Sequence, residues 1–323
     1  MATYNAESLL GGAGGTNLLP RSVSDEIWKE ATAQAIVPTL AKAHPIIIGE
    51  NVVPVLTKRP AASIVGELGN KPDSQLEVGA KVIKPIKAVV GLEFSMETIQ
   101  QNPANVLDIM SQELSDALAR QIDLAVLHGR QASDGKPLSG DPEYLNKTTN
   151  RVTVTGDPAN ADAELWEGYG LVINSDTAHN FTGFGMDPRL VGLIANARDK
   201  EGRRINTDIA MGSTLTTYAG QTVAVSRAIS GQVDASADTK VRAFAGDWEA
   251  LRFGRALDIP VKKIEFGDPF GNGDLQRRNA VAYMAECVFG WGILDLNAFV
   301  AYELAGTTEA AGGESGGTDP VAG

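Results

Sequence analysis

The sequence predicts an α+β fold in which one long helix accompanies several long strands. Residues 102–129 place apolar side chains at steps of three and four, the spacing of a helix that buries one face. In residues 86–96 every second side chain is apolar, which is the pattern of a strand with one buried face. Residues 278–296, which are rich in apolar and aromatic side chains, predict a last long strand.

The long helix has a start signal and a stop signal. Asn102 suits the N-cap, Pro103 suits the first helical position, and Gly129 suits a left-handed cap at the end. At about 1.5 Å per residue the helix is roughly 40 Å long, enough to span a domain as a spine. Its buried stripe is expected to be Leu107, Met110, Leu114, Leu118, Ile122 and Ala125. The carboxylates of the helix are expected on a solvated face, where Asp116 can pair with Arg120. These carboxylates are Asp108, Glu113, Asp116 and Asp123.

The segments before this helix predict an arm and a projecting hairpin. Residues 1–20 are Gly-rich and are expected to form a flexible arm, followed by a helix that Ser24 caps and Pro38 kinks or ends. Residues 58–88 contain a strand–turn–strand pattern with its turn at residues 70–73. Because this stretch holds six basic and three acidic residues in an acidic chain, the hairpin is a candidate contact for an acidic neighbour.

The second half of the chain mixes helices and strands. A helix is expected around residues 162–175, and residues 181–205 are strand-like. Further strands are expected at residues 221–229, 241–254 and 260–266. The Gly-rich tail, residues 305–323, carries only negative charges and is expected to be disordered.

Composition narrows the classes of function. The chain has 323 residues, enough for one large domain or two ordinary ones, and its net charge of −12 argues against wrapping a nucleic-acid backbone. A single cysteine, Cys287, excludes an intramolecular disulfide and fits a reducing compartment. The sequence contains no apolar run long enough to span a membrane and no signal peptide at its start. We therefore expect a protein that is made in the cytoplasm.

The residues that usually carry catalysis are scattered. His44, His128 and His179 lie far apart without metal-ligand spacing, so each is interpreted as structural. Cys287 lies in an apolar strand, which predicts a buried, inert thiol. We expect neither a cofactor nor a metal, and the absence of common motifs weighs against an ordinary enzyme.

The order of these elements resembles one known family. Arm, kinked helix, projecting hairpin, strand, spine helix, mixed domain and final strand follow one another as in the major capsid proteins of tailed bacteriophages, which have the Hong Kong 97-like fold. The stretches that carry the resemblance span roughly residues 20–303. They are "GELGNKPDSQLEV", "IKAVVGLEFSMETI", "AVLHGRQASDGKPLSG", "MDPRLVGLIANARDKEGRRI", "GQTVAVS", "FAGDWEALRFG" and "CVFGWGILDLNAFV". The fourth of them, residues 186–205, is similar to a family pattern in which a Pro-anchored helix ends in Asp-x-x-Gly and a basic residue.

The resemblance implies an architecture and a function. The expected parts are an N-terminal arm with a helix (1–44), a peripheral domain with the spine helix (45–57, 89–150 and 270–304), an extended β-hairpin loop (58–88), a central, axial domain (151–269) and the acidic tail (305–323). The subunit would self-assemble as hexamers and pentamers into an icosahedral shell of the virion. That shell would enclose double-stranded DNA without sequence-specific binding and would be assembled in the host cytoplasm. Portal and scaffolding or decoration proteins are the expected partners, and no membrane is involved.

Two other functions stay open at this point. An encapsulin-type bacterial compartment would share the fold but enclose a cargo enzyme. An enzyme of α+β architecture would need a pocket of convergent titratable groups, and the sequence offers none.

The resemblance also implies a covalent bond between subunits. Some members of the family form an isopeptide bond between a lysine of the extended loop and an asparagine near the final strand, with a glutamate as the base. Here the corresponding residues are Lys71 as the nucleophile, Asn279 as the acceptor and Glu286 as the base. The alternative is that Lys71 is a solvated turn residue, Asn279 a cap at a strand start and Glu286 a paired surface acid.

Overall fold

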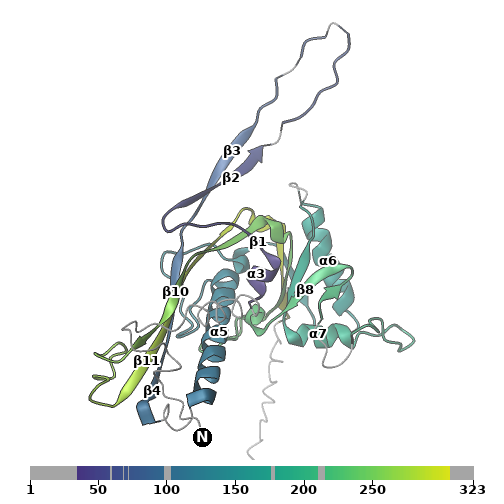
Figure 1. The fold of residues 1–323 in the computed structure, drawn as a ribbon. Coiled ribbons are helices and arrows are strands. Elements are labelled where there is room, and N and C mark those ends of the chain that lie inside the picture. The colour runs from purple at the N-terminus through teal and green to yellow at the C-terminus, as the bar shows by residue number, and fades with distance from the viewer. Residues whose placement is uncertain are drawn as a thin grey trace, which may run out of the picture.

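One long helix and two sheets form the body of the protein, and a two-stranded hairpin projects from that body (Figure 1). The expected arm, the helix after Ser24, Asn102 and the tail beyond residue 305 lie outside the described residues of this computed structural model. The structure describes residues 35–58, 60–67, 69–71, 73–97, 103–175, 179–209 and 215–305. Within these ranges no helix has the length and hydropathy of a membrane span.

The first sheet has four strands in the order β1, β10, β11, β4. Both β10 and β4 are antiparallel to β11, and β1 is parallel to β10. The strands are Lys42–Ala43 (β1), Ile86–Ser95 (β4), Leu251–Ile264 (β10) and Ala280–Ile293 (β11). The alternation predicted around β4 is confirmed, because one face of this segment packs against the core. That face consists of Ile86, Ala88, Val90, Leu92, Phe94 and Met96.

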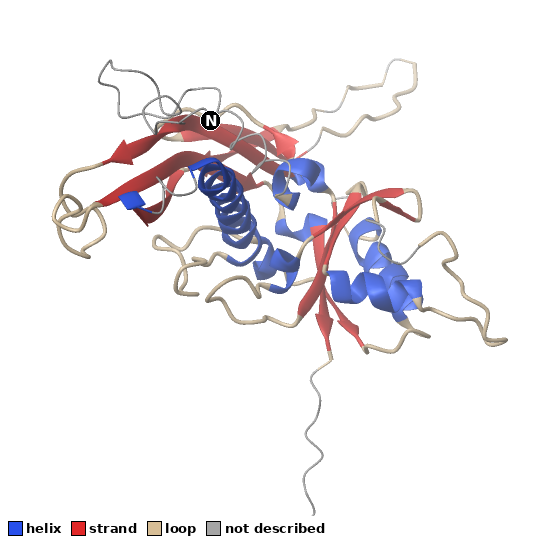
Figure 2. Ribbon diagram, turned by 60° about the horizontal axis from the view of Figure 1, so that its bottom comes forward, coloured by secondary structure: helices blue, strands red, loops and turns tan. Residues whose placement is uncertain are grey.

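Helix α5, Pro103–His128, lies along one face of this sheet (Figure 2). Where its side chains are described, the predicted stripe is confirmed, and each member is at most 1% exposed: Met110, Leu114, Leu118, Ile122 and Ala125. The side chain of Leu107 lies outside the described residues. Gly129 follows the helix with a φ of 63°, which confirms the left-handed cap. Each large side chain buried on the stripe contributes roughly 1.5–3 kcal/mol, so α5 is a packed spine.

The prediction of a solvated carboxylate face is wrong for Asp123. A short helix, α3 (Ile36–Leu40), packs on α5, and the Asp123 carboxylate accepts the backbone N–H groups of Ile36 and Val37, both at 3.0 Å. The first N–H groups of a helix have no partner within it, so a buried acceptor stabilises this end of α3. Burial raises the pKa of Asp123 to about 7.

The predicted pair between Asp116 and Arg120 is also replaced. Arg120 Nε lies 3.3 Å from Asp234 Oδ2, a carboxylate more than a hundred residues further along the chain. The spacing of residues on one helix therefore did not predict the partner of Arg120, because the tertiary structure places another carboxylate beside it.

The second sheet has six strands in the order β5, β12, β9, β6, β8, β7. Helix α6, Ala161–Ile173, confirms the helix predicted around residues 162–175 and packs on β5 and β12. The strands are Arg151–Val154 (β5), Gly183–Met186 (β6), Thr217–Tyr218 (β7), Gln221–Val225 (β8), Val241–Gly246 (β9) and Phe299–Leu304 (β12). Short 3₁₀ helices occupy Leu145–Lys147, Arg227–Ser230, Trp248–Ala250 and Leu296–Ala298.

The strand-like segment 181–205 divides into strand β6 and helix α7, Pro188–Ala195. Asp187 caps α7 by accepting the N–H of Arg189 at 2.8 Å, and Pro188 takes the first helical position. This confirms the Pro-anchored helix that the resemblance implies in residues 186–205. The strand-like interpretation is wrong for this half of the segment, because it did not use the start signal at Asp187 and Pro188.

Strand pairing departs from the predicted domain ranges at two elements. The predicted axial range 151–269 includes β10, yet β10 pairs with β11 of the first sheet. The predicted peripheral range 270–304 includes β12, yet β12 pairs with β5 and β9 of the second sheet. Alternation identifies a strand but not its partner, because pairing joins residues far apart in the sequence. The division into domains itself stays a prediction.

The projecting hairpin consists of β2, Asn51–Lys58, and β3, Glu77–Ile83 (Figure 1). Its regular pairing ends where Lys58 meets Glu77. Of the described residues between these two positions, none belongs to a strand, so the strands end earlier than the pattern at 66–79 predicts. A ribbon with no core beneath it has little to hold a longer ladder together.

Candidate assembly surfaces and crosslinking residues

The hairpin exposes apolar side chains along its length. Ile64 is fully exposed, and several further residues of the hairpin and its approach are more than a third exposed. They are Ile47, Ile48, Val52, Val65, Leu76, Val78 and Val82. A contiguous set of exposed apolar side chains on a projecting element is typical of a contact surface. An isolated two-stranded ribbon is marginally stable in water, so this hairpin fits a partner that covers it.

The base of the hairpin is anchored in the body. Ile83 is fully buried and packs with Ile46 and Val53 beside β11. Gly292 of β11 allows this approach, because a Cβ there would lie 2.7 Å from Cγ1 of Ile83. Lys81 Nζ lies 2.6 Å from Glu143 Oε2 in the loop after α5. The hairpin is therefore anchored at its base.

Lys71 lies in the distal part of this hairpin, between the ends of β2 and β3. Its side chain is exposed, and no hydrogen bond or ion pair joins it to any other described residue. A nucleophile that must reach another subunit needs such a position, and so does a solvated turn residue.

Asn279 comes directly before β11 and has an exposed side chain. Its φ of 52° lies in the left-handed region, which asparagine tolerates better than most residues. Its carbonyl accepts the N–H of Met96 at 2.9 Å, so the backbone is tied to the end of β4. The backbone contact gives Asn279 a structural role at the start of the strand. Its exposed side-chain amide is accessible to a neighbour.

Glu286 lies in the middle of β11 and is 8% exposed. Its Oε2 lies 2.5 Å from Nζ of Lys87, which comes from β4. The neighbouring residues Ala285 and Cys287 belong to the core shared with α5, so Glu286 points to the other face of the sheet. The carboxylate is thus held by an ion pair within its own subunit.

A single copy does not bring the three predicted residues together. Asn279 and Glu286 are seven residues apart on one extended segment, a separation of about 23 Å. Lys71 projects with the hairpin, away from both. Sequence reasoning missed Lys87 as the partner of Glu286, because the register between β4 and β11 cannot be read from either strand alone.

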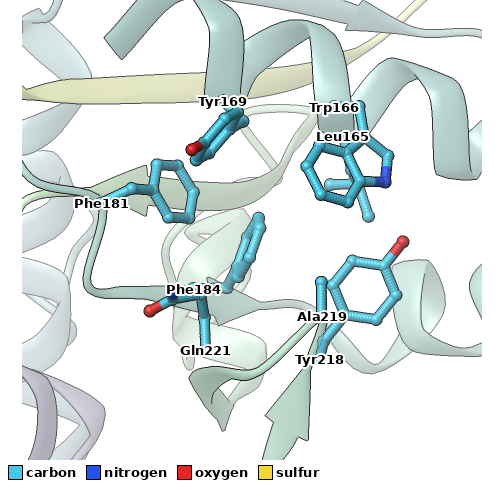
Figure 3. Close-up of a pocket in the computed structure, with 8 residues that line it drawn as sticks. All are labelled: Leu165, Trp166, Tyr169, Phe181, Phe184, Tyr218, Ala219 and Gln221. Carbon is cyan, nitrogen blue, oxygen red and sulfur yellow. The ribbon is translucent and has the colours of Figure 1, made fainter. Parts of the chain in front are cut away.

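Sequence reasoning also missed an aromatic pocket beside α6. We define the aromatic pocket by the eight residues that Figure 3 labels: Leu165, Trp166, Tyr169, Phe181, Phe184, Tyr218, Ala219 and Gln221. Five of the rings form an edge-to-face series with successive centroids 4.9–5.7 Å apart. Aromatic pairs prefer this geometry. The rings come from three separate segments, which explains why no local pattern revealed them.

The histidines His128 and His179 and the cysteine have structural surroundings. His128 Nε2 lies 2.9 Å from the carbonyl oxygen of Ile229, and burial lowers the pKa of His128 to about 4. His179 Nε2 lies 3.0 Å from Asp295 Oδ2. Cys287 is fully buried in the core, as predicted. Over the described ranges, no group of three or more His, Cys, Asp or Glu side chains is arranged to hold a metal ion.

Comparison with known proteins gives consistent matches. A solved chain of Gordonia phage Cozz is 57% identical, with a TM-score of 0.76 over 92% of this chain and 95% of that chain. A chain of Mycobacterium phage Ogopogo is 30% identical, with a TM-score of 0.73 over 84% of this chain and 92% of that one. A structure described as the capsid of an empty GTA particle is 16% identical and shares the fold, with a TM-score of 0.58 over 85% and 90%. No curated protein sequence matches the chain.

A family model supplies the assignment. The model of the phage capsid family matches residues 15–304, which is most of the chain and includes both sheets, α5 and the hairpin. The alignments include nearly the whole length of the two phage chains. The mixed architecture agrees with the Hong Kong 97-like fold that the sequence predicts. Phage capsid proteins form the shell of the virion. This protein belongs to the phage capsid family.

Proposed function

We propose that copies of this protein assemble as hexamers and pentamers into an icosahedral shell that encloses the double-stranded DNA of a tailed phage. The observation that carries the proposal is the hairpin of β2 and β3. It is anchored at its base, yet it projects apolar side chains such as Ile64 beyond the core of its own subunit. A neighbouring copy that covers the hairpin explains both properties, because burial of these side chains stabilises the contact by roughly 25 cal/mol per Å².

The charge of the chain fits a container. With a net charge of −12, the subunit has no excess of basic residues with which to bind the phosphate backbone, so enclosed DNA would be retained by the wall rather than by contacts. Portal and scaffolding or decoration proteins are the further partners that this function requires. Assembly in the host cytoplasm fits the single, buried thiol.

Electron microscopy of the purified protein tests the proposal. Closed shells with fivefold vertices are the expected result. A matched variant replaces residues 60–76 by a short Gly-Ser turn and keeps the anchored base of the hairpin. This variant is expected to stay folded by circular dichroism and to form no shells. A wild-type protein that remains monomeric under all assembly conditions would contradict the proposal.

We propose in addition that Lys71 of one copy forms an isopeptide bond with Asn279 of another. The neutral Lys71 amine attacks the side-chain carbonyl carbon of Asn279, a C–N bond forms, and the amide nitrogen leaves as ammonia. The Glu286 carboxylate of a third copy takes the amine proton and returns one to the leaving group, because Glu286 of the copy that supplies Asn279 lies too far from that residue. Exposed side chains at Lys71 and Asn279 support the first two roles. For the third role, Glu286 must exchange its contact with Lys87 for one with the incoming lysine.

A denaturing gel of boiled, reduced particles tests the bond. Wild-type shells are expected to give a ladder of linked chains, whereas Lys71→Arg or Asn279→Asp restores a single band. Glu286→Gln keeps the shape of the side chain but removes both the base and the ion pair with Lys87, whereas Lys87→Gln removes the ion pair alone. Links that are lost in Glu286→Gln and kept in Lys87→Gln are the result expected of a base. A single monomer band from mature wild-type shells would exclude the bond and leave the shell proposal standing.

A further inference from the structure

We infer that the aromatic pocket beside α6 receives a loop of a neighbouring copy of this chain, the basic loop of residues 198–205. The inference rests on the proposed function, because it requires copies packed side by side around an axis. It names both surfaces of that contact.

The outer face of α6 is unusually apolar for a surface helix. Its inner face buries Leu165, Gly168 and Val172 against the second sheet. Its outer face nevertheless exposes large apolar side chains, with Trp166 53% and Tyr169 37% exposed; the others are Leu171 and Ile173. Large apolar side chains that gather on the solvent side of a helix are typical of a contact surface. The sheet covers one side of α6, so the other side is a contact surface.

The pocket at this surface has the size of one side chain. Its volume is about 120 Å³, and the surfaces that line it are mainly aromatic rings (Figure 3). Pockets for drug-sized ligands and cofactors measure about 300–1,000 Å³. The pocket is therefore suited to an aliphatic side chain of a protein rather than to a small-molecule ligand.

The pocket has a carboxylate at its wall and no basic residue from α6. Of the acidic residues of α6, Glu164 is turned away from the pocket, because it accepts hydrogen bonds from the N–H and the hydroxyl of Thr155. Asp162 accepts a hydrogen bond from the hydroxyl of Tyr218, so this carboxylate lies at the pocket wall. An occupant with a basic rim around an apolar centre would complement this surface, whereas a nucleic acid would be repelled.

The basic loop has these properties. It follows α7 and contains four basic residues against two acidic ones. The side chain of Arg203 is 77% exposed, although it lies 3.8 Å from Asp199 Oδ2 and 3.6 Å from Glu201 Oε2 of the same loop. Ile205, at 47%, is the one large apolar side chain that the loop exposes. The loop thus combines an aliphatic group of suitable size with cations that stack on aromatic rings and pair with carboxylates.

The loop is also held in shape before any contact is made. Asp199 Oδ1 accepts the N–H groups of Glu201 and Arg203 at 3.0 and 2.8 Å. The Arg204 guanidinium donates to the carbonyl oxygens of Ala195 and Ile209 at 2.8 and 3.1 Å. A preorganised loop loses little conformational entropy on binding, which favours the contact.

Pocket and loop are two different surfaces of the same subunit. The loop does not line the pocket of its own chain. When one surface of a subunit binds a different surface of the next copy, the contact is heterologous and repeats into a closed ring if the rotation closes. This is the geometry that pentamers and hexamers require. We therefore assign the contact to neighbours within one ring.

A mixed-disulfide experiment tests the inference. One preparation carries Ala219→Cys at the pocket and a second carries Ile205→Cys in the loop; the only native thiol, Cys287, is buried. The two are assembled together and mildly oxidised. A disulfide-linked dimer is expected only in the mixture, since neither variant alone holds both cysteines. The matched control pairs Ile205→Cys with Lys136→Cys, an exposed position in the loop after α5, and is expected to stay monomeric on the gel.

Charge exchange provides a second measurement. Arg203→Glu is expected to lower the yield of shells at least tenfold, and a compensating Asp162→Arg at the pocket wall is expected to restore it. Shells that assemble normally but give no mixed disulfide and show no charge rescue would overturn this inference and leave the proposed function intact. If the wild-type protein forms no shells at all, the proposed function falls and this inference falls with it.

Discussion

Helix α5 and the β2–β3 hairpin are both long, but they differ in what holds them. The stripe of α5 is buried within the subunit, and the C-terminal part of the helix also buries side chains off the stripe, including Leu124 and Leu127. The hairpin has a buried anchor only at Ile83 and its neighbours, and further out it exposes Ile64. The helix is stabilised by its own chain, whereas the hairpin is completed by another copy in the proposed shell. Equivalent substitutions should therefore affect folding of the subunit in α5 and assembly of the shell in the hairpin.

The largest effect is expected on the helix side of this comparison. Leu118→Asp places a charge without a partner in a fully buried position, at a cost of several kcal/mol against a total stability of about 5–15 kcal/mol. The variant is expected to be insoluble or unfolded, as circular dichroism and urea unfolding would show. Glu113→Gln, at an exposed position on the same helix, is the matched control. A folded, shell-forming Leu118→Asp protein would mean that the stripe is not the subunit's core.

The contact between α5 and α3 predicts a pH dependence. The folded pKa of Asp123, about 7, lies above its unfolded value near 4, so folding favours the protonated form. The stability gained from Asp123 is complete below about pH 4 and is lost as the pH rises to about 7. Relative to Asp123→Asn, the wild-type free energy of unfolding should fall over this window by up to about 4 kcal/mol.

Urea unfolding of both proteins across this pH range measures the difference. Asp116→Asn tests whether the removal of any other carboxylate from α5 has the same effect. Parallel stability curves for wild type and Asp123→Asn would show that Asp123 is ionised in the fold as it is in the unfolded chain.

A smaller effect is expected at the base of the hairpin. Lys81→Gln removes the pair with Glu143, and both side chains are partly solvated, so the loss should be no more than about 1 kcal/mol. Because salt screens such pairs, the difference from wild type should shrink at high ionic strength. A loss that is large and independent of salt would indicate that Lys81 acts through packing of its stem instead.

The smallest effect on the subunit is expected at the exposed part of the hairpin. Ile64→Asp makes the same kind of change as Leu118→Asp but at a solvated position, so the free energy of unfolding should change by about 0.5 kcal/mol or less. Shell formation, measured by electron microscopy, should nevertheless be lost. If Ile64→Asp assembles as wild type does, the contrast between a self-sufficient helix and a neighbour-dependent hairpin fails.

Much of the fold followed from local patterns in the chain. The start and end of α5 are set by Pro103 and Gly129, and the buried faces of α5 and β4 follow from periods of 3.6 and 2 residues. The order of such elements also carried the resemblance to phage capsid proteins. These features depend on residues close together in the sequence, whose geometry the backbone itself dictates.

The candidate sites depended on tertiary structure. The sequence placed Lys71, Asn279 and Glu286 in a loop, at a strand start and within a strand, but it did not show that Glu286 pairs with Lys87. It also did not show that Asp123 accepts the first N–H groups of α3. In both cases the partners are supplied by segments far away in the chain, and only the pairing of strands and the docking of helices bring them within hydrogen-bonding distance.

The amino-acid sequence by itself determined most of the elements, the buried faces of α5 and β4 and the family, because period, caps and turn residues act over a few positions. Tertiary structure alone decided that β12 joins β5 and β9 and that three segments close the aromatic pocket. The physical reason is that a strand has two edges, each of which can pair with many others, and a helix face can pack on many surfaces. The choice among them is made by the burial of the whole core at once, which no short stretch of sequence encodes.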